Sequence, residues 1–207
     1  MGMSPAVVLG ALLVHLELTA LSLLLAAILG IPLGIHLARA RFLAGPVLAV
    51  VSAIQTIPSV ALLGFLIPFF GIGTKPAVVA LFLYSLLPIV RNTYTGIEQV
   101  DAAAIEAARG MGMRDGQILL RVTIPQALPV LMAGIRTATV LCVGVATLAA
   151  LIGAGGLGSF IFRGISMLNT KMVLAGAIPA GVLALSLDGA LALVERWITP
   201  PGLRKGD

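Results

Sequence analysis

The chain alternates long apolar runs with short polar connections. Five runs are long enough to cross a membrane, because a hydrocarbon core of about 30 Å needs about 20 apolar residues in a helix. We expect these spans at residues 16–38, 46–70, 76–95, 126–152 and 171–194. The pattern therefore predicts an all-α membrane protein with one transmembrane domain over residues 1–207, which ends in a flexible tail from residue 195.

The one long polar stretch, residues 97–125, separates the third run from the fourth. Its first half has apolar residues at three- and four-residue spacing, which predicts a short amphipathic helix. Asp101 is suited to begin this helix, since its carboxylate can cap the positive helix end. Gly110 and Gly112 predict the helix end, because glycine permits the positive φ of a sharp turn. A second short helix is expected from about 114 to 121, running on into the proline that ends the stretch.

Composition excludes a water-soluble domain. Hydrophobic residues make up 59% of the chain and charged residues 10%, whereas soluble domains carry about 25% charged residues. The mean hydropathy is +1.13. The formal net charge of +5 comes mostly from residues between the apolar runs, so it fits membrane orientation better than nucleic-acid binding.

The basic residues predict which side faces the cytoplasm. One side of a five-span chain receives Arg39, Arg41, Arg91, Arg109, Arg114, Arg121, Arg196, Arg204 and Lys205. The other side receives only Lys75, Arg163 and Lys171. Because cytoplasmic loops carry an excess of Lys and Arg, we expect the polar stretch to face the cytoplasm, the N-terminus to lie outside and the C-terminus inside.

Polar side chains within the second run are candidates for a solute path. Gln55, Thr56 and Ser59 flank a kink at Pro58, and Gln55 falls near the middle of the membrane. The alternative is that these groups only bind neighbouring helices. Aromatic residues make up 5% of the chain, and tight recognition of a cation normally uses aromatic rings, so the sequence favours a conduit over a selective site.

Two charged residues are expected inside the membrane. Arg136 and Asp188 lie at similar depths, about 15 Å and 12 Å from the cytoplasmic ends of their spans. An isolated charge there is expensive, so the sequence predicts an ion pair between them. The alternatives are that each residue faces a partner subunit or a watery cavity. His15 and Glu17 are expected as anchors at the outer interface of the first span.

The chain lacks the motifs of an ATPase. Residues 71–75 are rich in glycine but do not end in the Gly-Lys-Ser/Thr of a phosphate-binding loop. Residues 153–158 satisfy G-x-G-x-x-G but lack the strand and the acid of a dinucleotide site. We therefore expect no cofactor, metal or catalytic residue. An intramembrane enzyme and a membrane scaffold remain the rival classes, although Asp188 has no second acid in the apolar runs to form a dyad.

A motif in the polar stretch resembles the EAA loop of bacterial ABC importer permeases. Its positions fall on Glu106, Ala107, Ala108, Gly112, Val122, Ile124 and Pro125. The resemblance implies a MetI-like permease fold, with five transmembrane helices and a cytoplasmic coupling helix between spans 3 and 4. It also implies that the residues that meet the ATPase are Glu106, Ala107, Ala108, Gly112 and Pro125.

The same resemblance implies the partners and the location. These are two ATP-binding cassette subunits, a second permease copy or paralogue and an extracytoplasmic solute-binding protein, in the bacterial plasma membrane. Residues 54–68, 71–97 and 148–158 are similar to the osmoprotectant branch of these permeases, whose solutes are glycine betaine, carnitine and choline. Another small solute, such as an amino acid, is the alternative.

Overall fold

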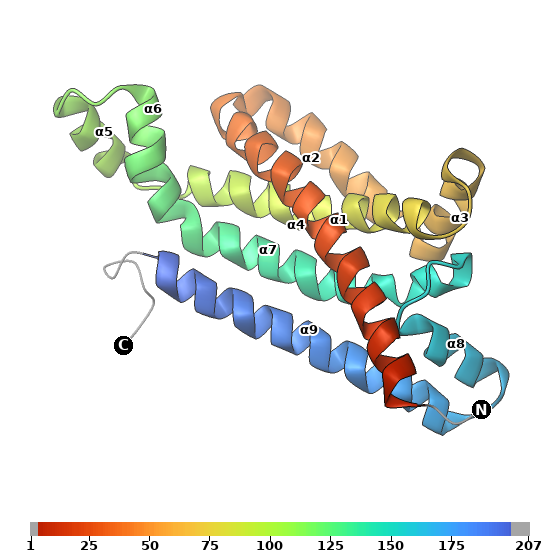
Figure 1. Cartoon of the computed structure of the whole chain (residues 1–207). Helices are drawn as coiled ribbons and strands as arrows, with labels where there is room; N and C mark the ends of the chain where they lie inside the picture. Colours follow the sequence, from red (N-terminus) through yellow and green to blue (C-terminus); the bar gives the residue numbers. More distant parts are fainter. Residues whose placement is uncertain (1–3, 200–207) are drawn as a thin grey trace.

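The computed structural model describes residues 4–199, and every element within that range is helical. The elements are α1 (Pro5–Arg39), α2 (Arg41–Thr56), α3 (Ser59–Phe70), α4 (Thr74–Glu98), α5 (Ala102–Gly110), α6 (Asp115–Ile118), the π-helix η1 (Leu119–Thr123), α7 (Ile124–Ala146), the 3-10 helix η2 (Leu148–Ile152), α8 (Gly158–Ser166) and α9 (Thr170–Ile198). The predicted all-α class is confirmed (Figure 1).

The centre of the fold is α4, which contacts both α1 and α7, while α7 also contacts α9 (Figure 1). Glycines let these helices approach closely. A Cβ at Gly34 of α1 would lie 2.6 Å from Cβ of Thr93, and one at Gly134 of α7 would lie 2.5 Å from Cβ of Asn92. Association of helices within a membrane depends on such close packing, because lipid tails are as apolar as the helices themselves.

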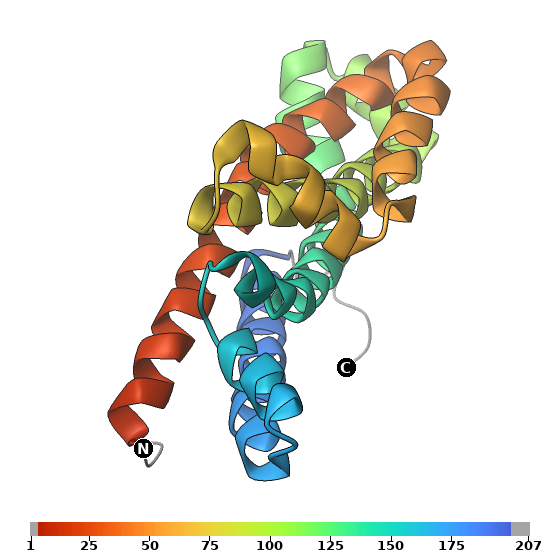
Figure 2. The same cartoon turned by 90° about the vertical axis from the view of Figure 1, so that its right-hand side faces the viewer.

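Within the described residues, four helices are long and apolar enough to cross a membrane: Pro5–Arg39, Thr74–Glu98, Asp115–Ala146 and Thr170–Ile198. The expectation that residues 46–70 form one kinked helix is wrong. Its two halves, α2 and α3, meet at 97°, and Figure 2 shows α3 lying across the long helices. The pair is either one broken span, which makes five spans, or a re-entrant loop.

Long-range contacts explain why this bend exceeds a proline kink. Pro58 provides no N–H to continue the helix. Gln55 then donates from Nε2 to O of Tyr84 over 2.7 Å, and the Tyr84 hydroxyl donates to O of Ile57. Side chains from α2 and α4 therefore bind backbone oxygens on both sides of the interface and hold the break open.

Several helix ends differ from the prediction. The first span begins at Pro5 rather than 16, and α4 continues to Glu98, so it takes the first residues of the polar stretch. The tail expected from 195 is helical to Ile198, and residues 200–207 lie outside the described part.

The second short helix is not separate, because α6 and η1 continue into α7. Pro125 does not interrupt this helix, which passes through it directly after the π-helix Leu119–Thr123.

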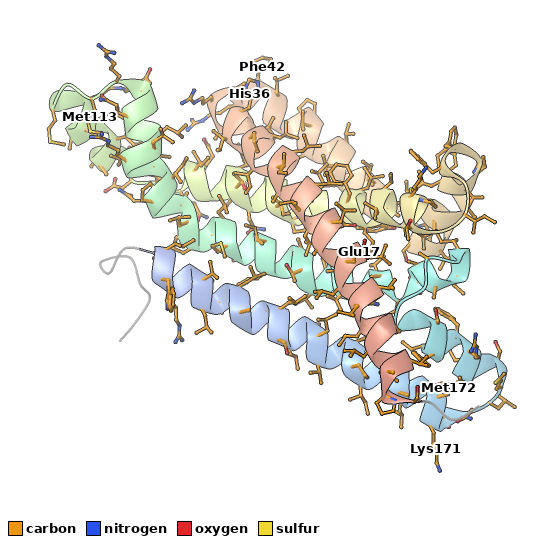
Figure 3. The ribbon with its side chains drawn as sticks, viewed as in Figure 1. Glu17, His36, Phe42, Met113, Lys171 and Met172 are labelled. Carbon is orange, nitrogen blue, oxygen red and sulfur yellow. The ribbon has the colours of Figure 1, made fainter. Side chains whose placement is uncertain are left out.

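The expectation that His15 anchors the outer interface is also wrong. Its side chain is fully buried, and Nε2 donates to O of Val143 in α7 over 3.0 Å. Because α1 begins earlier than expected, His15 lies inside the helix and not at its end. Glu17 stays exposed, well along α1 (Figure 3).

The long helices end in two separate regions of the molecule. His36, Phe42 and Met113 mark one end, whereas Lys171 and Met172 mark the opposite end (Figure 3). The first end holds α5, α6 and the α1–α2 turn, and the second end holds α8 and the start of α9 (Figure 1). The polar stretch predicted from the sequence thus lies beyond one end of the long helices.

Candidate functional site

The first candidate site is the coupling segment, defined as residues 97–125. Its amphipathic helix is α5, and Asp101 begins it as predicted, with Oδ1 accepting a hydrogen bond from N of Ala103 at 2.9 Å. The helix ends at Gly110, and Gly112 has φ +80°. No atom lies within 4 Å of a Cβ built on Gly112. Glycine is therefore required here for its backbone conformation and not for lack of space.

The residues of the sequence motif lie on different sides of this segment. Glu106 and Ala107 are exposed on α5, whereas Ala108 is buried. Since Ala108 faces inward, α5 is anchored by one side and presents Glu106 on the other. Pro125 lies at the far end of the segment, in the first turn of α7. The segment thus offers an exposed helix face to a protein that approaches this end of the molecule.

Ion pairs connect the coupling segment to the long helices. Glu98, at the end of α4, accepts from Nε of Arg41 over 3.0 Å, so α4 is tied to the start of α2. A longer pair of 3.8 Å joins Arg109 to Asp115 between α5 and α6. Both pairs are largely exposed and contribute little stability each. The stronger connection between the coupling segment and the long helices is the helix itself, since α6, η1 and α7 are continuous.

The π-helix within that connection was not predicted. It covers Leu119–Thr123, directly before the α7 residues Ile124 and Pro125. π-helical turns are rare and often occur at functional sites. A proline later in the helix is one visible signal, but the sequence does not distinguish a π-turn from an ordinary first turn.

The solute-path candidates lie around the α2–α3 break. Nε2 of Gln55 donates a hydrogen bond to O of Tyr84. This contact agrees with the alternative in which Gln55 only binds a neighbouring helix. Thr56 is exposed and donates to O of Ala53 in its own helix over 2.7 Å. Ser59 is partly exposed in the first turn of α3. Tyr84, which sequence reasoning did not single out, binds the end of α2 at Gln55 and the break at Ile57.

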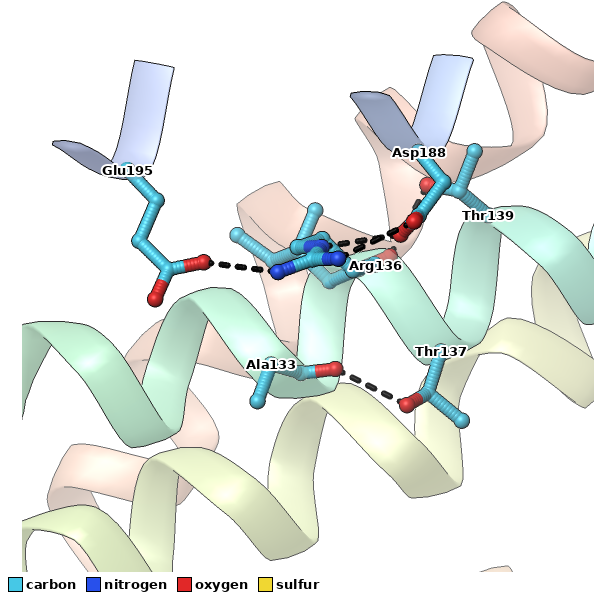
Figure 4. A network of polar contacts seen from close by, with 7 residues as sticks. Ala133, Arg136, Thr137, Thr139, Asp188 and Glu195 are labelled. Atoms are coloured by element: carbon cyan, nitrogen blue, oxygen red, sulfur yellow. Dashed lines mark hydrogen bonds and ion pairs between the residues drawn. The ribbon is translucent and has the colours of Figure 1, made fainter. Parts of the chain in front are cut away.

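The charged residues expected within the membrane form a cluster between α7 and α9 (Figure 4). Nε and Nη2 of Arg136 donate to the two carboxylate oxygens of Asp188 over 2.8 Å and 3.0 Å. The predicted pair is therefore present, with the bidentate geometry that makes arginine–carboxylate pairs strong. It is not deeply buried, because the two side chains are 32% and 31% exposed in the isolated chain.

A third member of this cluster was missed. Nη1 of Arg136 donates to Oε2 of Glu195 over 3.1 Å. Glu195 belongs to the tail expected from residue 195, but α9 continues past it. Asp188 and Glu195 are then about two helical turns apart, which puts them on the same face of α9. This spacing was the available signal. Among residues 4–199, no group of three His, Cys, Asp or Glu side chains is arranged to hold a metal ion.

Comparison with known proteins defines the class. Residues 28–200 match the family described as "Binding-protein-dependent transport system inner membrane component". This match covers most of the chain, and the chain belongs to that family. It is a membrane permease subunit of the ABC importer class, and ATP hydrolysis in such importers belongs to separate subunits.

The most informative relatives are osmoprotectant permeases. The chain is 46% identical over 190 residues to the glycine betaine/carnitine/choline transport system permease protein OpuCB of Bacillus subtilis, covering 92% of this chain and 88% of the relative. It is 49% identical over 195 residues to the osmoprotectant import permease protein OsmW of Salmonella typhimurium, covering 92% and 91%.

The fold agrees with a solved importer. The permease of the inward-facing MetNI methionine ABC transporter superposes with a TM-score of 0.86 at 25% identity, covering 96% of this chain and 100% of that one. The predicted MetI-like permease fold is therefore confirmed. Since a methionine transporter has this fold, the fold alone does not define the solute.

Proposed function

We propose that this chain forms the translocation path of an importer for a small osmoprotectant of the quaternary ammonium type, such as glycine betaine, carnitine or choline. The observation that carries the proposal is the similarity over 92% of the chain to a permease named for glycine betaine, carnitine and choline, at 46% identity, and to one named for osmoprotectants, at 49% identity. An amino acid is the second candidate, supported by the MetNI fold at lower identity.

The partners follow from the size and chemistry of the subunit. Two permeases, either two copies or a copy and a paralogue, enclose the path together, because four or five spans enclose little volume alone. Two ATP-binding cassette subunits supply the energy, and an extracytoplasmic solute-binding protein delivers the solute. The chain supplies neither ATP hydrolysis nor high-affinity selection.

The orientation places the coupling segment in the cytoplasm of a bacterial cell, with the protein in the plasma membrane. Arg39, Arg41 and Arg109 belong to the end that carries α5, whereas Lys75 and Lys171 belong to helix starts at the other end. The excess of arginine on the α5 side supports this orientation by the positive-inside rule. The N-terminus is then outside, and α9 ends on the cytoplasmic side.

Coupling runs from the ATPase through α5 and α6 into α7. Glu106 meets a basic or polar group of the ATPase, and the turn at Gly112 sets the angle between α5 and α6. Because α6, η1 and α7 are one helix, a displacement at the segment moves the wall of the path, as expected for alternating access. Gln55, Thr56 and Ser59, at the α2–α3 break, are the candidate residues of that wall.

Purification of the tagged chain from its native membrane tests the assembly. We expect two ATP-binding cassette subunits and a second permease to co-purify. The variant Glu106→Ala should lose the ATPase but retain the second permease, because only the ATPase contact is removed. Isolation of the chain without any ATPase from membranes that contain one would contradict the proposal.

A further inference from the structure

An open cavity of about 430 Å³ lies along α7, where α9 contributes Asp188 of the Arg136 cluster. Its lining consists of Ala133, Arg136, Thr137, Val140, Leu141 and Asp188. This volume falls within the range of about 300–1,000 Å³ found for small-molecule sites. The cavity is separate from the α2–α3 break, since none of its lining residues comes from α2 or α3.

The uncovered stripe of α7 differs in composition from a lipid-facing surface. Small or weakly polar residues alternate there with two aliphatic ones: Ala133, Thr137 and Gly144 are exposed beside Val140 and Leu141. The exposed side of α1 instead carries large aliphatic side chains, namely Leu21, Leu24, Leu25, Ile28 and Leu29. Lipid favours the second type of surface, whereas small and polar residues are typical of packed helices or of a watery path.

The Arg136 cluster beside the cavity has more negative than positive groups. One guanidinium faces the carboxylates of Asp188 and Glu195, so the formal charge of the cluster is negative. A partly exposed charged cluster at membrane depth needs water or a polar ligand beside it, since lipid cannot solvate it. Arginine has five N–H donors, and three are used here. Two donors of Arg136 remain for another acceptor.

We propose that this cavity is a low-affinity binding site for quaternary ammonium solutes as they pass through the permease. The negative field of Asp188 and Glu195 attracts the ammonium group, whose methyl groups pack against Val140 and Leu141. In a zwitterion such as glycine betaine, the carboxylate accepts from the free N–H groups of Arg136. The site binds weakly because Asp188 already has a partner, and weak binding lets the solute leave.

The site rests on the proposed function, but its test does not require transport. Val140→Cys in a Cys142→Ala background places one thiol in the cavity of the assembled permease–ATPase complex, in lipid nanodiscs. The thiol is reacted with a trimethylammonium methanethiosulfonate and, separately, with a sulfonate methanethiosulfonate. Each rate is divided by the rate of the same reagent with free 2-mercaptoethanol. We expect the normalised rate of the cationic reagent to exceed that of the anionic one.

Glu195→Gln then removes one negative charge and leaves the Arg136–Asp188 pair in place. We expect this change to lower the cation-to-anion ratio on the order of fivefold, the Coulomb effect of one charge at several ångströms after discounting for exposure. Glu17→Gln on α1 is the matched control with the same charge change outside the cluster, and it should leave the ratio unaltered. Glycine betaine or choline in millimolar excess should slow the labelling.

The proposal is overturned if the thiol is inert to both reagents, if Glu195→Gln leaves the ratio unchanged, or if neither solute protects. Leu141→Cys, on the same wall, replaces Val140→Cys should that variant fail to fold. Leu24→Cys on the aliphatic face of α1 should stay unlabelled. A separate uptake assay distinguishes the two claims: absence of betaine uptake together with a cation-selective cavity would contradict the proposed solute and not the charge of the site.

Discussion

Gly134 gives the sharpest test of how the central helices pack. A Cβ at this position would lie 2.5 Å from Cβ of Asn92 and 2.7 Å from O of Pro88. Carbon atoms prefer separations of about 3.5–4.0 Å. Both atoms are fixed to the α4 backbone, so no side-chain rotation removes the clash. Gly134→Ala must therefore push α7 away from α4.

The magnitude follows from two opposing effects. Overpacking of a tight contact costs about 1–3 kcal/mol, while alanine in place of glycine within a helix gains about 0.5–1 kcal/mol. We expect Gly134→Ala to destabilise the fold by up to about 2.5 kcal/mol. For a chain of this length, each kcal/mol corresponds to a shift of roughly 2–4 °C in Tm, so the Tm should fall by up to roughly 10 °C.

The assay is thermal unfolding of the detergent-solubilised protein, followed by the monodisperse fraction that remains after heating. Gly144→Ala is the matched control on the same helix, because no atom lies within 4 Å of its Cβ. We expect this control to be unchanged or slightly more stable. If Gly134→Ala were as stable as Gly144→Ala, the close approach of α4 and α7 would be refuted.

Two further predictions concern coupling and the solute path. Glu106→Ala or Gly112→Val should abolish solute uptake while the protein remains in the membrane, because the first removes an ATPase contact and the second forces a branched residue to positive φ; uptake at the unmutated rate in vesicles would contradict the coupling role. Cysteine at Gln55 or Ser59, without Cys142, should react with a small polar thiol reagent to an extent that depends on the nucleotide state. Inertness in every state would exclude these positions from the path.

Local chemistry made the coupling segment predictable. The cap at Asp101 and the turn at Gly112 depend on residues within a few positions of each other, so the sequence contains the information directly. The positions of both features agree with the structure. The continuous helix from α6 into α7 was misjudged because Pro125 was treated as a stop, whereas the helix passes through Pro125 directly after the π-helix Leu119–Thr123.

Long-range contacts explain what the sequence did not predict. The 97° bend depends on Tyr84 of α4 reaching the α2–α3 break, and the burial of His15 depends on the register of α1 against α7. No local pattern specifies either contact. Arg136 and Asp188 were paired correctly because helical rise gives their depth. Glu195 was missed only because the end of α9 was placed too early.

Transport by the reconstituted complex tests the central claim most directly. The permease pair, the ATPase and the solute-binding protein are placed in liposomes, and accumulation of radiolabelled glycine betaine, carnitine, choline and methionine is measured with and without ATP. The account predicts ATP-dependent accumulation of at least one quaternary ammonium solute and none of methionine. Accumulation of methionine alone, or the same accumulation without ATP, would contradict it.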